Sequence, residues 1–250
     1  MVSTFVQYRR VSSATVKTAL ARGWQNFSAE RNISVTYALM FALIGLSMFV
    51  LIEHFSLTPM ILPLAGGFML VGPVLLTGFF SLADRIEAKQ PVHLSDVADG
   101  FRRSPRGLWI VALVCALLFM IWVSDAATLY GFMVGRLPMS LLDLLPPPEN
   151  VVSFALWSSI MGAVLAFLIF AVSAFSVPLL YYRRTDLVPA VVASVRAIFG
   201  NFFVVIPWAI LLSASIIGSI LLLPLFPIVF PVLAYASHAF YRELFPDTPV

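Results

Sequence analysis

Residues 197–241 contain no Lys, Arg, Asp or Glu, and this stretch constrains the fold of the chain more than any other feature. A helix needs roughly 20 mostly apolar residues to cross the hydrocarbon layer of a bilayer. The stretch is too long for one crossing, and Pro224 and Pro227 interrupt it. Because proline removes a backbone donor and breaks a helix, the stretch predicts two membrane-spanning helices joined by a short turn.

Four further apolar segments are long enough to cross a bilayer. They are residues 33–52, 57–83, 107–131 and 151–180. The composition agrees, because the chain is 61% hydrophobic and 11% charged, whereas a soluble domain has about 25% charged residues. We therefore predict an all-α polytopic membrane protein with six transmembrane helices.

The basic residues predict the orientation of these helices. Every Lys and Arg except Arg136 lies before the first span, between the second and third, between the fourth and fifth, or after the sixth. The positive-inside rule then places both termini in the cytoplasm. We expect residues 1–32 to form a cytoplasmic segment, residues 33–245 a single six-helix membrane domain, and residues 246–250 a cytoplasmic tail.

A polar segment before the third span has the spacing of an amphipathic helix. Leu94, Val97, Ala98 and Phe101 recur at i, i+3, i+4 and i+7, and Pro105 ends the pattern. Such spacing places apolar side chains on one helix face. The same kind of pattern precedes the first and fifth spans, which predicts three cytoplasmic amphipathic helices at residues 16–27, 94–103 and 188–199.

Each predicted amphipathic helix is followed by a hairpin of two spans. The second span of each hairpin contains a proline, at Pro73, Pro178 and Pro231, where we expect a kink. The chain therefore predicts a three-fold repeat of one unit, an amphipathic helix followed by a transmembrane hairpin. The alternative is that interfacial helices simply connect the spans, as they do in many polytopic proteins.

The predicted external loop of the second unit, residues 132–150, is long. Its "MSLLDLL" segment has the composition of a helix lying flat on the outer membrane surface. Three consecutive prolines follow it, and they favour an extended linker instead. Both interpretations stay open at this point.

Three segments resemble a known family. They are "ILPLAGGFMLVGPVLLTGFF", "SLADRIEAKQPVHLSDVADGFRRSP" and the closing "PVLAYASHAFYREL". Together they resemble a domain-of-unknown-function family of uncharacterised bacterial six-span integral membrane proteins, over roughly residues 15–245. The resemblance implies a six-span fold in the inner membrane of a bacterium, and no activity. Some members of that family have been given the name of an oxidase subunit.

The histidine content tests that oxidase name. A haem-copper oxidase core needs several histidines on transmembrane helices. This chain has His54, His93 and His238, and only His238 lies well inside a predicted span. The sequence therefore excludes a catalytic oxidase subunit and leaves an accessory role near an oxidase open.

His238 is the first candidate functional residue, in the cytoplasmic half of the last predicted span. A polar group at that depth usually faces protein or water. Tyr235, Tyr241 and Arg242 are near it in the sequence. We expect a packed, neutral ring that is hydrogen-bonded to a neighbour such as Tyr235 or Tyr241. The alternatives are a proton-relay or ligand residue, and a metal site for which no second ligand pattern is present.

Glu53, His54 and Asp125 form the second candidate group. They lie near the outer ends of the first and third predicted spans. They could meet as a small polar site. The alternative is that they mark where the helices leave the hydrocarbon layer.

The sequence contains no GxxxxGK[ST], GxSxG or HExxH motif, so nucleotide hydrolysis, serine hydrolysis and zincin chemistry have no motif support. We predict a non-enzymatic scaffold or accessory subunit of a membrane complex, which contacts the lipid bilayer and other membrane-protein subunits. We expect neither cofactors nor nucleic-acid partners. A carrier or channel with a path near His238 is the alternative, and a membrane-embedded enzyme using His238 or Glu53 and Asp125 is a third.

Overall fold

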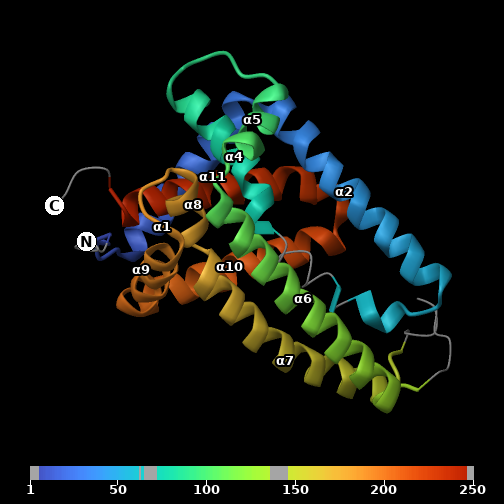
Figure 1. The fold of residues 1–250 in the computed structure, drawn as a ribbon. Coiled ribbons are helices and arrows are strands. Elements are labelled where there is room, and N and C mark those ends of the chain that lie inside the picture. The colour runs from blue at the N-terminus through green and yellow to red at the C-terminus, as the bar shows by residue number, and fades with distance from the viewer. Residues whose placement is uncertain (1–5, 62, 65–71, 136–145, 247–250) are drawn as a thin grey trace.

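The computed structural model describes residues 6–61, 63–64, 72–135 and 146–246, and every regular element in these ranges is a helix (Figure 1). The helices are α1 Ser13–Ala29, α2 Arg31–His54, η1 Thr58–Met60, α4 Gly72–Glu87, α5 Ser95–Arg103, α6 Arg106–Met133, α7 Glu149–Ser173, α8 Ser176–Tyr181, α9 Leu187–Gly200, α10 Phe202–Leu221, η3 Leu223–Leu225 and α11 Phe226–Leu244. The predicted all-helical class is confirmed.

Four of the described helices are long and apolar enough to cross a membrane: α2, α6, α7 together with α8, and α10. Large apolar side chains point outward from them, such as Leu43, Leu113 and Ile210. The chain is thus an integral membrane protein with several apolar helices. The second predicted span, residues 57–83, includes residues that the structure does not describe. The helix α11 ends in charged residues and is not among the four apolar helices. The count of six spans therefore remains a prediction.

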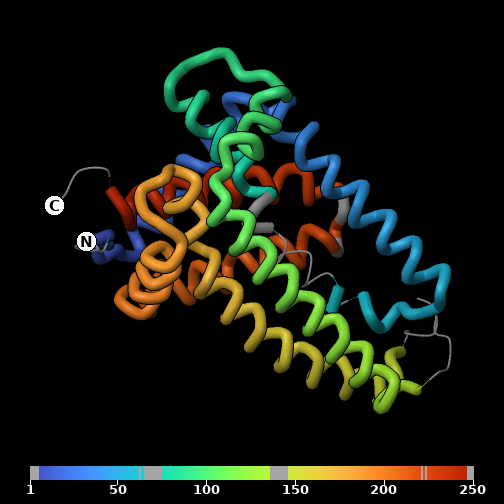
Figure 2. Tube along the Cα trace, in the orientation of Figure 1, coloured from blue at the N-terminus to red at the C-terminus, as the bar shows by residue number. Residues whose placement is uncertain are grey.

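α11 occupies the centre of the molecule, and other helices surround it. It packs against α1, α2, α4 and α10, and Figure 1 shows it (red) running through the middle of the fold. Most of its side chains are buried, including those of Tyr235, His238 and Phe240. By contrast, α6 and α7 lie side by side as a long hairpin that extends away from this centre (Figure 2).

All three segments predicted to be amphipathic helices are helical, as α1, α5 and α9. Each of them packs on a helix of a different hairpin: α5 on α4, α9 on α7 and α8, and α1 on α11. In Figure 1 they lie toward the end of the molecule where α6 begins and α8 ends. The three-fold repeat itself stays a prediction.

A small residue stands at each of these three helix contacts. A Cβ on Gly23 would lie 2.5 Å from the Val232 carbonyl oxygen of α11, and one on Gly100 would lie 2.5 Å from the Thr77 carbonyl oxygen of α4. In α9, the Ser194 hydroxyl donates to the Ala171 carbonyl at 2.8 Å. The backbones approach closely because these positions have little or no side chain.

The three prolines predicted to kink the second spans differ in their surroundings. The α7 helix ends at Ser173 and α8 begins at Ser176, because Pro178 has no N–H to bond the carbonyl four residues earlier. Pro73 lies in the first turn of α4, and the residues before Gly72 are outside the description. α11 continues through Pro231 without interruption. The predicted "MSLLDLL" loop segment also lies outside the described residues.

The contact between α1 and α11 predicts a large effect of a small substitution. Gly23→Ala should lower the free energy of unfolding by about 1–3 kcal/mol, because the added methyl overpacks against the α11 backbone. Thermal unfolding in detergent measures this. Gly45→Ala in α2 is the matched control, because a Cβ there meets nothing within 4 Å. Equal melting temperatures for the two variants would contradict the close approach.

Candidate functional site

His238 is completely buried within the described structure, at 0% exposure. Its Nε2 lies 2.8 Å from the Tyr182 hydroxyl, and its ring packs on that of Phe80. The expected partner was a tyrosine of the same helix, but the Tyr235 hydroxyl bonds Ser34 instead, and Tyr241 stacks on the Tyr182 ring. The partner named in that expectation was wrong, because Tyr182, which follows α8, takes this place on the His238 ring.

Tyr182 links His238 to a carboxylate of α4. Its hydroxyl donates to Asp84 Oδ1 at 2.8 Å, and the same Oδ1 is 3.7 Å from His238 Nε2. Tyr182 follows the last residue of α8, and Arg183, at φ 51°, then turns the chain. The short helix after the Pro178 break therefore delivers the hydroxyl to the gap between α4 and α11.

A second carboxylate of α4 faces the other ring nitrogen. Glu87 Oε1 is 3.8 Å from His238 Nδ1, which is too long for a hydrogen bond. Buried Nδ1 has no hydrogen-bond partner in the part of the chain that the structure describes. The second oxygen of Glu87 accepts from the Arg242 guanidinium. The imidazole thus lies between two carboxylates that are one helical turn apart.

The pKa values of Asp84 and Tyr182 are both raised above their ordinary values. Partial burial raises the pKa of Asp84 to about 6, although the Tyr182 hydrogen bond and the Arg242 and Arg103 charges act in the opposite direction. Burial, together with the charge of Asp84, raises the pKa of the Tyr182 phenol well above its ordinary value. Tyr182 therefore stays a neutral hydroxyl, while Asp84 changes charge near neutral pH.

The second predicted group does not form one site through the contacts that the structure shows. Glu53 accepts a hydrogen bond from Thr58 Oγ1 at 2.6 Å, and the His54 ring packs on Phe55. Asp125 is exposed on α6. Glu53 and Thr58 help to fix the turn after α2, which favours the interpretation that these residues mark the helix end.

Sequence reasoning missed Asp84, Glu87 and Tyr182, which lie at the edges of predicted spans. One signal was available: Asp84 stands at the same distance after Pro73 as Arg242 stands after Pro231. An alignment of the segments after Pro73 and Pro231 places Asp84 opposite Arg242. These residues of opposite charge lie near the ends of α4 and α11, which pack against each other.

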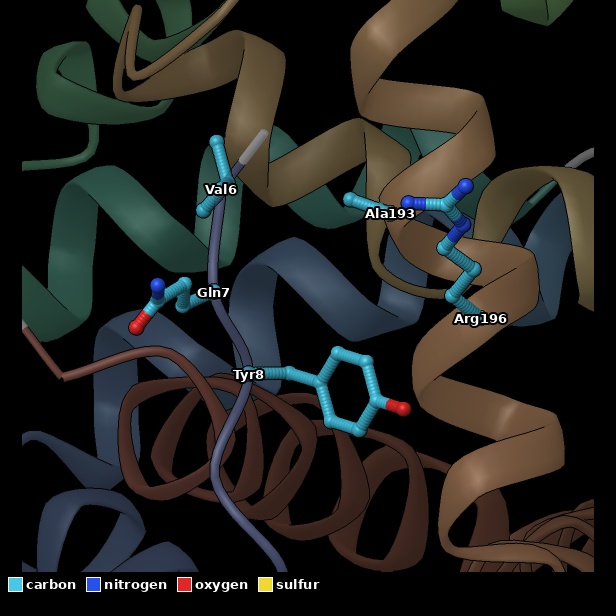
Figure 3. A pocket seen from close by; sticks show the side chains of 5 residues that line it. All are labelled: Val6, Gln7, Tyr8, Ala193 and Arg196. Atoms are coloured by element: carbon cyan, nitrogen blue, oxygen red, sulfur yellow. The ribbon is translucent and has the colours of Figure 1, made fainter. Parts of the chain in front are cut away.

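A separate hollow of about 230 Å³ lies between the N-terminal segment and α9. Gln7 and Tyr8 line one side of it and Arg196 the other, as Figure 3 shows. None of the residues predicted from the sequence lines it. The buried His238 cluster is therefore a different part of the molecule from this open hollow.

The hydrogen bonds of Tyr182 predict a stability effect of removing its hydroxyl. Tyr182→Phe leaves both His238 Nε2 and Asp84 without this partner, and should cost about 1–3 kcal/mol of unfolding free energy. Thermal unfolding in detergent tests it against Tyr130→Phe, because the Tyr130 hydroxyl has no hydrogen-bond partner among the described residues. A Tyr182→Phe variant as stable as Tyr130→Phe would show that the chain of bonds does not contribute.

Comparison with known proteins gives one match, to the family described as "Predicted integral membrane protein (DUF2189)". No curated protein and no solved structure matches the chain. The family match includes α4 to α8, and with them both carboxylates of the cluster. Over residues 61–181 the chain therefore matches DUF2189, a family of predicted integral membrane proteins of unknown function, as the resemblance of the sequence implied.

Proposed function

We propose that the protein is a non-enzymatic scaffold or accessory subunit of a membrane complex. The observation that supports this is the exposure of its apolar helices. In the most apolar 18-residue stretch of α2, only 17% is buried within the chain. The corresponding share is 22% in α6 and 22% in α10. Lipid covers part of such faces, and helices of partner subunits pack on the rest.

Three glycines in the apolar helices have no neighbouring atoms beside them, which supports contact with helices of a partner subunit as well as with lipid. A Cβ on Gly45 of α2, Gly131 of α6 or Gly218 of α10 would meet nothing within 4 Å. Glycine inside a helix costs roughly 1 kcal/mol relative to alanine, and none of the described residues fills the space beside these three glycines. Small residues on membrane helices let a second helix approach closely, so these positions fit contact with another subunit.

The architecture that goes with this function is six spans and three cytoplasmic interfacial helices, arranged as a three-fold repeat. The cyclic contacts of α5 with α4, α9 with α7 and α8, and α1 with α11 support it. So do Gly23, Gly100 and Ser194, which follow Leu20, Val97 and Val191 at the same spacing in the three helices. Equivalent positions thus make the close contact in each unit.

The basic residues support an orientation with both termini in the cytoplasm of a bacterium and the spans in its inner membrane. Cysteines introduced at Ser140 and Ser95, in a variant without Cys115, test this with a membrane-impermeant thiol reagent. Ser140→Cys should react in intact spheroplasts, and Ser95→Cys only after the membrane is permeabilised. The reverse pattern would overturn the orientation and the span count that depends on it.

The scaffold function predicts a stoichiometric membrane partner that needs the open glycine face of α2. Gly45→Leu should not lower the melting temperature of the purified chain, because leucine favours a helix more than glycine does, and it should reduce co-purification of that partner in mild detergent. Leu43→Phe, a change at a neighbouring exposed side chain that retains Gly45, is the matched control.

The polar cluster around His238 favours a second candidate, a carrier or channel. If the chain purifies alone and supports solute or ion flux in liposomes, and His238→Gln abolishes that flux, the carrier is correct and the scaffold is wrong.

A further inference from the structure

We propose that Asp84, Tyr182, His238 and Glu87 form a proton-binding switch between α4 and α11. Uptake of one proton by this cluster leaves Asp84 protonated and the proton of the neutral His238 ring on Nδ1 instead of Nε2, where it faces Glu87. The proposal does not depend on the scaffold function, because it follows from the hydrogen-bond geometry of the cluster alone.

The first state has an ionised Asp84. Two 2.8 Å contacts meet at the Tyr182 oxygen, one to Asp84 Oδ1 and one to His238 Nε2. The phenol has a single proton, which it donates to the carboxylate. Nε2 must then donate its own proton to the phenol oxygen, and a neutral ring has none left for Nδ1. The bare Nδ1 faces the Glu87 carboxylate at 3.8 Å, so two acceptors oppose each other in a buried place.

The second state has a protonated Asp84. The carboxyl now donates to the Tyr182 oxygen, and the phenol donates to His238 Nε2, which has given up its proton. The ring therefore carries its proton on Nδ1, which points at Glu87 Oε1. Every polar hydrogen then has an acceptor, and the buried nitrogen gains the partner that it lacks in the first state. To reach this state, the Nε2 proton passes to the phenol oxygen and the phenol proton passes to Asp84 Oδ1, along the two 2.8 Å contacts. One proton from water reaches Nδ1 past the partly exposed Glu87 carboxylate, so the charge of the cluster rises by one.

The neighbouring groups allow the cluster to take up that proton. The side chain of Asp84 is 39% exposed and that of Glu87 is partly exposed, whereas His238 is fully buried, so water reaches the two carboxylates and not the ring. Arg242 pairs with one oxygen of Glu87, and the other oxygen faces Nδ1 as the acceptor. The remaining charged or titratable groups facing the cluster are Arg103 and Asp99 of α5, Tyr181 of α8 and Tyr241 of α11. Burial raises the pKa of Asp84 to about 6.

The switch has a mechanical consequence, because its members come from three hairpins. Asp84 and Glu87 belong to α4, Tyr182 follows α8, and His238 belongs to α11. A hydrogen bond from Nδ1 to Glu87 requires the 3.8 Å gap to close to about 3 Å. Proton uptake thus draws the end of α4 toward α11, whereas proton release loosens that contact.

Nitrogen NMR of the full-length protein, labelled with ¹⁵N-histidine in nanodiscs, tests the proposal between pH 5 and pH 8. The His238 signals, assigned by their loss in His238→Gln, should change from the Nε2–H to the Nδ1–H tautomer as the pH falls. Asp84→Asn should hold the Nδ1–H tautomer at every pH, because its amide donates to Tyr182 as a protonated carboxyl does. The matched control Glu149→Gln, at the start of α7, should keep the transition.

Three results would overturn the switch: an Nε2–H ring throughout the range, a ring that becomes doubly protonated, or a transition that Asp84→Asn leaves unchanged. A measurement on the wild-type protein decides the matter where the variant fails to fold. Infrared spectra with ¹³C-labelled aspartate should show a protonated carboxyl band that appears with the same midpoint as the tautomer change. Absence of that band at pH 5 would equally refute the proposal.

Thermal unfolding gives an independent readout with a defined sign. A carboxyl whose pKa is higher in the folded state binds its proton more tightly there, so its protonation stabilises the fold. We expect the melting temperature of the wild type, relative to that of Asp84→Asn, to fall as the pH rises from 5 to 7.5. A constant difference between the two proteins across this range would contradict proton uptake by Asp84.

Discussion

The close backbone contact between α1 and α11 is the interaction on which the rest of the structure depends. Gly23 lies against the backbone of α11 at Val232 and Ala236, so α1 covers one side of the last helix. α2, α4 and α10 cover others. Surrounded in this way, α11 contacts protein where the other apolar helices contact lipid. A helix in that position tolerates polar side chains such as His238, because they face partners in the protein and not hydrocarbon.

This arrangement explains why apolar composition identifies some of the helices better than others. Leu43 and Leu113 point away from the protein on α2 and α6, and a lipid-facing surface must be apolar along its length. α11 has no such requirement, and Tyr235, His238 and Arg242 lower its hydropathy. The last two of the six spans were predicted from the absence of charge over residues 197–241. Of the described helices, four are apolar enough on their own, and α11 is not among them.

Periodicity predicted the existence of the polar helices, but only part of how they are buried. Val97 and Phe27 are buried as the pattern requires, whereas Trp24, Leu94 and Val188 are among the exposed apolar side chains. Spacing along a helix defines a face but does not say what covers it, and an interfacial helix has both protein and lipid as neighbours. The cluster was harder still, because Tyr182 is 56 residues from His238 and 98 from Asp84. Only tertiary packing brings them together, so the sequence could place His238 in the interior without showing its partners.

The position of the cluster also explains why a proton can act there without a charge entering the interior. Transfer of an isolated charge to a buried place costs several kcal/mol, and His238 has no exposed surface. In the proposed switch the imidazole stays neutral in both states, and only the place of its proton changes. The charge that changes belongs to Asp84, whose side chain is partly exposed to water. Tyr182 lies between the carboxylate that changes charge and the ring that changes tautomer. Its neutral hydroxyl reverses its hydrogen bonds when Asp84 is protonated, so His238 responds while the charge stays at the surface.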